Sequence, residues 1–492
     1  MSNPPPAPPA ALADRFSRRA WATLLVLCAA LFLDALDVSM MGVALPSIGA
    51  DLGMSTNELQ WIMSSYVVGY GGFLMLGGRA SDLIGRRRVF LCSLGVFVVF
   101  SGLGGLATTG ALLIAARFVT GVSAAFTTPA GLSLITTSFA EGPARNRALA
   151  IYTATGAAGI SLGLVLGGVL TELSWRWAFF VPVIVAAATW LVAVRLIPRA
   201  AGESPASGSF DVAGAVCATA AMLLFVFTVV EAPTVGWASL RTLGSLVATG
   251  VIMLVFVMIE RRAQAPLVRL GILRSGALVR ANLGAMSLFG GWLGFLFVAT
   301  LYMQELRSWS ALATGLAVFP PGLVVAVLAP RIAAPLVGRF GLPRVILAGL
   351  ASTALAYALF LRIDLRSSYV TEMMPTFVLI GVGFTLAYGP LNIAATNGID
   401  PEEQGLAGGL VTTSFQLGGA VVLAIVAAVN TATTSTSSPQ AVLDGFHAAL
   451  LVPVAVAILG MGATALGLIR RAPRHRDIDA AAQPDTAVET EG

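Results

Sequence analysis

The chain has 492 residues, of which 57% are hydrophobic and only 11% are charged, and its formal net charge is +5. Ordinary soluble domains carry about 25% charged residues, so this composition excludes a typical soluble protein and indicates one that crosses a membrane several times. All 29 basic residues are arginines. Without lysine, the phosphate-binding loop that ends in Gly-Lys cannot occur, which argues against an ATP-driven pump.

The other composition signals restrict the chemistry further. The arginines lie in short segments between apolar runs, a distribution typical of membrane topology, so we expect no nucleic-acid partner. The three cysteines and two histidines are far apart and lack the spacing of metal ligands, so we expect no disulfide, metal or bound cofactor. No pairing of a nucleophile with a base is evident, and we therefore do not expect an enzyme.

Runs of mostly apolar residues dominate the chain from start to end. A helix that spans a bilayer needs about 20 such residues, and fourteen runs reach this length. We predict an all-α polytopic membrane protein with 14 transmembrane helices, whose bounds are good to roughly two to four residues. The predicted helices are 20–43, 57–79, 88–107, 110–133, 147–170, 177–197, 211–231, 239–259, 277–303, 311–333, 342–362, 371–394, 404–429 and 446–469.

The arginines also predict the orientation of these helices. If the N-terminus is cytoplasmic, 23 of the 29 arginines lie on the cytoplasmic side, as the excess of positive charge in cytoplasmic loops requires. Both termini are therefore predicted to be cytoplasmic. The arginine-only composition, rich in Ala, Gly and Val, favours a bacterial plasma membrane.

A sequence repeat divides the chain into halves. The segment Gly78–Arg88 follows the second apolar run, and a weaker copy, Val337–Arg344, follows the tenth. If the two correspond, each half has six helices, and the seventh and eighth helices are an insertion between them. The predicted parts are a disordered N-terminus (1–19), an N-terminal half (20–198), a linker (199–210), two inserted helices (211–259), a second linker (260–276), a C-terminal half (277–469) and a cytoplasmic tail (470–492).

Two carboxylates lie inside the first predicted helix. Asp34 and Asp37 are three residues apart and so share a helix face, and an ionisable residue at bilayer depth indicates a functional site. Asp37 lies about 13 Å below the outer helix end at Pro46, and Arg117 lies about 10 Å below the outer end of its own helix. Their similar depth predicts that they pair, either as part of proton coupling or as a static ion pair.

Asp34 has no evident basic partner in the sequence. Its side chain is too short to reach the membrane surface, and desolvation disfavours the charged form of a buried carboxylate. We therefore expect Asp34 to take up and release a proton, with Asp37 as the other candidate carrier.

Several motifs carry a resemblance to a known family. They are Leu36-Asp37 with Val43-Ala44-Leu45-Pro46, Gly78 with Asp82, Gly85, Arg86 and Arg88, Arg117 with Gly121 and Pro129, Trp175-Arg176-Trp177, and Phe210-Asp211 with Gly214. In these positions the chain resembles the fourteen-helix members of the major facilitator superfamily, in the drug:proton antiporter-2 group. The resemblance covers nearly everything from Ala20 to Ile469, and it implies the major facilitator fold.

The resemblance also implies roles for two further motifs. Gly78, Asp82, Gly85, Arg86 and Arg88 would form a conformational latch between the second and third helices, although a cytoplasmic turn anchored by positive charge would look similar. The group's antiporter motif in the fifth helix is represented by four glycines. These are Gly159, Gly163, Gly167 and Gly168.

The antiporter motif departs from the group at one position. Leu164 stands where the group has proline, so a proline kink is lost. The line of glycines still permits close helix packing, as it would on any tightly packed helix face.

Together these features predict a proton-driven secondary exporter of amphipathic drugs or antibiotics that works by alternating access as a monomer. A proton-coupled uptake symporter for a small metabolite is the alternative. Polar residues within the predicted helices are weaker candidates for substrate contact, and each could simply bond to a neighbouring helix. Besides Asp34, they are Gln304, Asn392 and Gln416.

Overall fold

The computed structural model describes residues 17–139, 143–197, 212–263, 270–399, 404–434 and 438–469, and within these ranges it contains helices and no strand. The predicted linker 199–210 and tail 470–492, and most of the predicted N-terminus, lie outside the described residues. The first six helices are α1 (Arg18–Leu52), α2 (Thr56–Ile84), α3 (Arg86–Gly105), α4 (Gly110–Ser138), α5 (Pro143–Leu173) and α6 (Trp177–Leu196).

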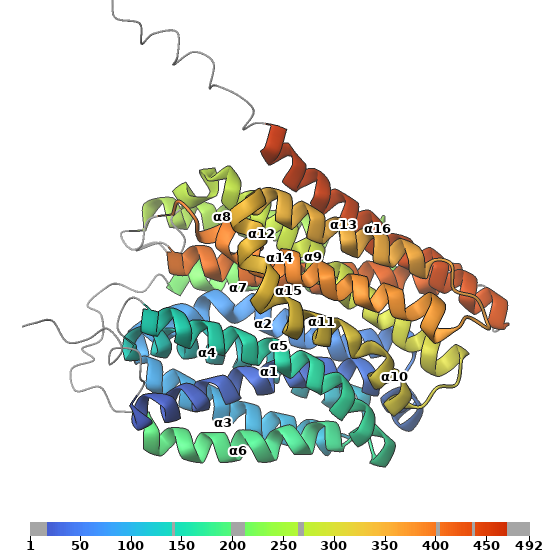
Figure 1. Cartoon of the computed structure of the whole chain (residues 1–492), viewed down its shortest axis with the longest axis horizontal. Coiled ribbons are helices and arrows are strands. Elements are labelled where there is room, and N and C mark those ends of the chain that lie inside the picture. Colours follow the sequence, from blue (N-terminus) through green and yellow to red (C-terminus); the bar gives the residue numbers. More distant parts are fainter. Residues whose placement is uncertain are drawn as a thin grey trace, which may run out of the picture.

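The later helices complete the bundle. They are α7 (Val212–Val235), α8 (Leu240–Arg262), α9 (Gly276–Leu301), α10 (Ala311–Val318), α11 (Pro320–Leu328), α12 (Ala334–Phe340), α13 (Leu342–Phe360), α14 (Met374–Thr396), α15 (Gln404–Thr433) and α16 (Pro439–Ile469). Figure 1 shows α1 to α6 packed together as one group and α9 to α16 as a second group beside it. The helices of both groups run roughly along one common direction.

Each predicted apolar run contains helix, but several bounds are wrong. α1 continues from 43 to Leu52, because a proline inside a membrane helix is tolerated where neighbouring helices surround it; it ends at Gly53, which adopts φ +63°. α15 continues to Thr433, past its predicted end at 429, and the hydroxyls of Thr431 and Thr433 donate to carbonyls four residues earlier. α16 begins at Pro439 rather than 446; its first turns mix polar residues such as Asp444 with buried apolar ones such as Leu443, which obscures the apolar run.

The tenth predicted helix is segmented. It comprises α10, α11, a π-helical turn over Ala329–Ala333, and α12, which ends at Phe340 rather than 333. Pro320 and Pro321 begin α11, and further prolines lie in the π-helical turn and at the start of α12. Since proline removes a backbone donor and clashes with the preceding turn, the helix cannot continue regularly through these positions.

Eleven helical segments in the described residues are long and apolar enough to cross a membrane. α2, α5 and α7 are not among them, although residues 158–173 of α5 and 213–229 of α7 form shorter apolar stretches. α2 is interrupted by polar side chains that it buries, among them Gln60, Ser64 and Ser65. The chain is thus a multi-pass membrane protein.

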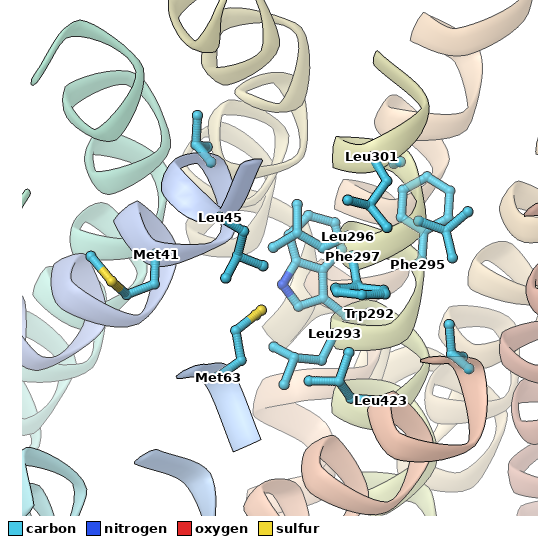
Figure 2. Packing of buried hydrophobic residues seen from close by; sticks show 14 of the residues in the cluster. Met41, Leu45, Met63, Trp292, Leu293, Phe295, Leu296, Phe297, Leu301 and Leu423 are labelled. Carbon is cyan, nitrogen blue, oxygen red and sulfur yellow. The ribbon is translucent and has the colours of Figure 1, made fainter. Parts of the chain in front are cut away.

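The two groups of helices meet at the end of the bundle where α1 ends. There, Leu45 of α1 and Met63 of α2 face Trp292 and Leu296 of α9 (Figure 2). Toward the opposite end each group has an apolar core of its own, one built from the start of α1 and its neighbours and one from the start of α9 and its neighbours. The halves are therefore joined at one end and have separate cores at the other.

Candidate functional site

The first part of the site is a buried ion pair between α1 and α4. Arg117 Nη1 donates to Asp37 Oδ2, and the two side chains are 2% and 0% exposed. Arg117 Nε also donates to the carbonyl of Ile62 in α2, at 3.3 Å. The pairing predicted from helix depth is confirmed. Asp37 Oδ1 has no hydrogen-bond partner within the described residues, so the pair is one bond short of full satisfaction.

Tyr66 of α2 connects this pair to Asp34. Its hydroxyl donates to Asp34 Oδ1, and its ring lies beneath the Arg117 guanidinium, with 4.5 Å from Cζ to the ring centroid. Tyr66 and Asp37 are buried, whereas Asp34 is partly exposed. Asp34 is therefore the carboxylate of this cluster that a proton or solute can reach most directly.

Sequence reasoning missed Tyr66. In the part of the chain that the structure describes, Asp34 has no ion-pair partner, and its hydrogen-bond partner is the phenol of Tyr66 on the next helix. A buried tyrosine hydroxyl usually finds a hydrogen-bond partner, and Tyr66 lies in the polar part of α2 with Tyr70 one turn further on. That pattern is the signal that could have found it.

The cluster of Asp34, Asp37, Arg117 and Tyr66 has one positive charge and two carboxylates. With both carboxylates ionised it carries a net charge of −1, and an uncompensated buried charge is costly. Uptake of one proton makes the cluster neutral. The arrangement can therefore hold a single exchangeable proton. Within the described residues, no group of three His, Cys, Asp or Glu side chains could hold a metal ion.

An aromatic surface in the C-terminal helices was also missed. Tyr388 of α14 is 41% exposed and lies 5.0 Å from Phe415 of α15 and 6.5 Å from Phe384, between ring centroids. Phe384 in turn contacts Trp292 of α9 at 5.9 Å. Trp292 belongs to the same apolar cluster as Tyr66 of α2, and Phe384 packs against that cluster. The aromatic surface therefore adjoins the core that also contains the tyrosine of the Asp34 cluster.

The glycines of the antiporter motif face two different helices. A Cβ atom added to Gly159 would lie 2.6 Å from the Phe32 carbonyl oxygen, and one added to Gly163 would lie 2.1 Å from Ser39 Oγ. A Cβ atom added to Gly167 would lie 2.9 Å from Met40 Cα. These three glycines, spaced four residues apart, let α5 pack directly against the backbone of α1.

Gly168 and Leu164 form a second close contact, between the two halves. A Cβ atom at Gly168 would lie 2.8 Å from the Ala311 carbonyl oxygen of α10, and one at Gly315 of α10 would lie 2.3 Å from the Leu164 carbonyl oxygen. α5 is one continuous helix through Leu164. The position that replaces the motif proline therefore lies directly in the contact between α5 and α10.

The predicted latch segment turns at Gly85, which has φ +103°, a conformation that favours glycine. Gly78 is near Pro129 of α4, since a Cβ atom added to it would lie 3.9 Å from the proline Cβ. Arg87, which was not singled out, donates to the Ile197 and Val194 carbonyls at the end of α6, each at 2.8 Å. Arg86 begins α3 and Arg88 is exposed. The side chain of Asp82 lies outside the described part of the structure.

The three weaker substrate candidates do not form one site. Gln304 Nε2 donates to the Val43 carbonyl of α1 at 2.9 Å, near the end where the halves join. Asn392 Nδ2 donates to the Tyr388 carbonyl of its own helix at 2.8 Å. Gln416 is buried in α15 and faces Gly71 of α2. In the described residues, no hydrogen bond joins any of the three to Asp34.

Two groups of apolar helices, one of which contains a buried ion pair beside a partly exposed carboxylate, define a class, the multi-pass membrane transporters. Residues 27–423 match the family described as the Major Facilitator Superfamily, and the chain belongs to this superfamily. Its fold resembles the crystal structure of the peptide-family transporter PepTSo, with a TM-score of 0.66 and 15% identity over 91% of this chain and 98% of that one.

Curated relatives are more similar in sequence. The chain is 37% identical to the puromycin resistance protein pur8 of Streptomyces alboniger, over 89% of each chain. It is 36% identical to the cephamycin export protein CmcT of Amycolatopsis lactamdurans, over 90% of this chain and 93% of the relative. These relatives are antibiotic resistance and export proteins of the same superfamily.

Proposed function

We propose that the protein exports amphipathic drugs or antibiotics and is driven by proton influx through alternating access. The observation that carries the proposal is the cluster of Asp34, Tyr66, Arg117 and Asp37, which joins one reachable carboxylate to a buried ion pair. The names of the relatives, which refer to resistance and export, support the direction. The proton gradient is the only energy source required, and no cofactor is proposed.

The proposed topology has 14 membrane helices. The halves are residues 20–198 and 277–469, and α7 and α8 form the inserted pair. Both termini lie in the cytoplasm, so that most arginines face inward, and the working unit is a monomer. In this orientation the joined end of the bundle is external, and the end with separate cores is cytoplasmic. That distribution supports a state closed to the outside.

Proton coupling follows from the charge balance of the cluster. In the neutral cluster one carboxylate holds a proton, and a cationic solute near Asp34 would favour the ionised form. Loading of a cation would then release the proton. For a neutral solute, Asp34 would carry the proton without contact. Because Asp37 is committed to Arg117, Asp34 is the carrier that the geometry supports better.

Substrate would bind between Asp34 and the aromatic surface of Tyr388, Phe415, Phe384 and Trp292. Aromatic rings offer large apolar contact area and can also attract a cation. Such a surface suits amphipathic compounds without selecting one scaffold. Gln416 and Asn392 remain weaker candidates for polar contact. Gln304 instead supports closure of the external end.

The proposal is tested by drug susceptibility in a bacterial host that lacks its own efflux pumps. Expression should raise resistance to several amphipathic compounds, and Asp34→Asn should abolish the increase although the protein still reaches the membrane. An uptake symporter for a metabolite is the second candidate, because it shares the architecture. Labelled compound would accumulate in inverted vesicles for an exporter and in right-side-out vesicles for a symporter.

A further inference from the structure

A cavity that is largely open to solvent lies apart from the Asp34 cluster, at the end of the bundle where the halves join. It has a volume of about 370 Å³, and its walls come from α1 and α5 on one side and from the segment between α9 and α10 on the other. Ligand sites commonly have volumes of about 300–1,000 Å³. None of the ten described residues that line it is basic.

Two carboxylates line this cavity, and only one of them accepts hydrogen bonds from the described residues. Glu172 of α5 accepts from the Leu312 backbone N–H at 3.2 Å and from the Ser310 hydroxyl, so it caps α10 across the two halves. Glu305, which is exposed, lines the cavity without an ion-pair or hydrogen-bond partner in the described residues. Arg307, two residues further along the chain, donates to Tyr302 Oη and to the Ser367 carbonyl oxygen, and its Cζ atom lies 5.9 Å from the centroid of the Trp309 ring.

Two more groups complete the cavity. Thr171 lines it and is 7% exposed, and its hydroxyl is buried without a hydrogen-bond partner. Buried polar atoms nearly always have a hydrogen-bond partner, so the Thr171 hydroxyl is available to bond to a ligand. Trp309 lines the same cavity, and its ring already attracts one cation, the Arg307 guanidinium.

We propose that this cavity is a second binding site, which takes an organic cation with an aromatic body and N–H donors. The unpaired carboxylate of Glu305 supplies the opposite charge, Trp309 the apolar contact, and Thr171 a further polar group. Because Glu172 already bridges α5 and α10, a bound cation would lie against the contact that holds the halves together at this end. The proposal concerns equilibrium binding and does not depend on the proposed export.

Ethidium, a planar aromatic cation with amino groups, is a suitable probe. Its binding would be followed in detergent by quenching of Trp309 fluorescence, taken as the difference between the wild type and Trp309→Phe. Glu305→Gln should weaken this binding about tenfold or more, because a bond to a charged group is lost. Thr171→Val should weaken it roughly threefold to tenfold without lowering the melting temperature, since a buried hydroxyl without a partner only costs desolvation and its removal does not destabilise the fold.

Two controls separate this site from the central one. Glu372→Gln removes an exposed carboxylate of the C-terminal half that does not line the cavity, and it should leave the titration unchanged. Asp34→Asn should also leave it unchanged. The proposal is overturned if Trp309 shows no saturable quenching, if Glu305→Gln behaves like Glu372→Gln, or if Asp34→Asn weakens the Trp309 signal as much as Glu305→Gln. Loss of export with retained Trp309 quenching would instead count against the proposed function alone.

Discussion

At the scale of single residues, the cluster of Asp34, Asp37, Arg117 and Tyr66 contains fewer positive than negative groups. One guanidinium serves two carboxylates, and the buried Asp37 receives it while the partly exposed Asp34 receives only a phenol hydroxyl. The axial depth of Asp37 and Arg117 could be predicted from the sequence, because helix rise fixes depth. The contribution of Tyr66 could not, because it depends on which helices are neighbours and how they are rotated.

The ion pair gives the first prediction at this scale. Arg117→Ala and Asp37→Asn should each abolish export, because either leaves a buried group uncompensated at a cost of about 3–5 kcal/mol. The double variant should be no worse than either single one. The matched control is Arg176→Ala, which breaks an exposed pair with Asp51 that is worth about 0–1 kcal/mol. Export in inverted vesicles and melting temperature would be measured, and additive losses would contradict the coupling.

Tyr66 gives the second prediction. Tyr66→Phe keeps the ring beneath Arg117 but removes the hydroxyl that stabilises ionised Asp34. Asp34 should then release its proton less readily, so export should slow at neutral pH and recover as the pH rises. Tyr70→Phe is the matched control, because its hydroxyl bonds to Thr128 at 3.1 Å and to neither carboxylate. A pH profile of initial export rate identical in wild type and Tyr66→Phe would rule out this role.

At the scale of helices, α5 packs closely against α1 on one side and against α10 on the other. Its glycines meet the backbone of α1 through Gly159, Gly163 and Gly167 and that of α10 through Gly168. A glycine line could be recognised in the sequence, but its partner helices could not be assigned from one helix. The helix ends were less predictable, because first turns such as those of α16 mix polar residues with apolar ones and obscure the apolar run.

The α1–α5 contact gives the third prediction. Gly163→Ala would place its Cβ atom 2.1 Å from Ser39 Oγ and 2.8 Å from the Leu36 carbonyl oxygen, so the helices must separate. Overpacking of this kind costs typically about 1–3 kcal/mol, and both melting temperature and export should fall. Gly102→Ala in α3 meets no atom within 4 Å and should be neutral or slightly stabilising. Equal behaviour of the two variants would show that α5 can move freely from α1.

At the scale of the whole molecule, the two halves share a core at one end and have separate cores at the other. Figure 1 shows two groups of helices side by side, while the predicted bounds of the halves stay a prediction. The family assignment rests on the comparisons. A sequence read alone gives apolar runs and their order, because each run is a local property. It does not give the conformational state, because contacts such as Gln304 with Val43 or Glu172 with Leu312 join residues far apart in the chain.

Coupling of Asp34 to the proton gradient is the central claim, and one reconstitution measures it most directly. Purified wild type and Asp34→Asn would be placed in proteoliposomes with an imposed pH gradient, and accumulation of a labelled amphipathic substrate would be followed. The wild type should accumulate substrate against its gradient. Asp34→Asn should equilibrate substrate at most, without accumulation at any imposed pH difference. If Asp34→Asn still builds a full pH-dependent substrate gradient, Asp34 does not carry the proton and the account of the cluster is wrong.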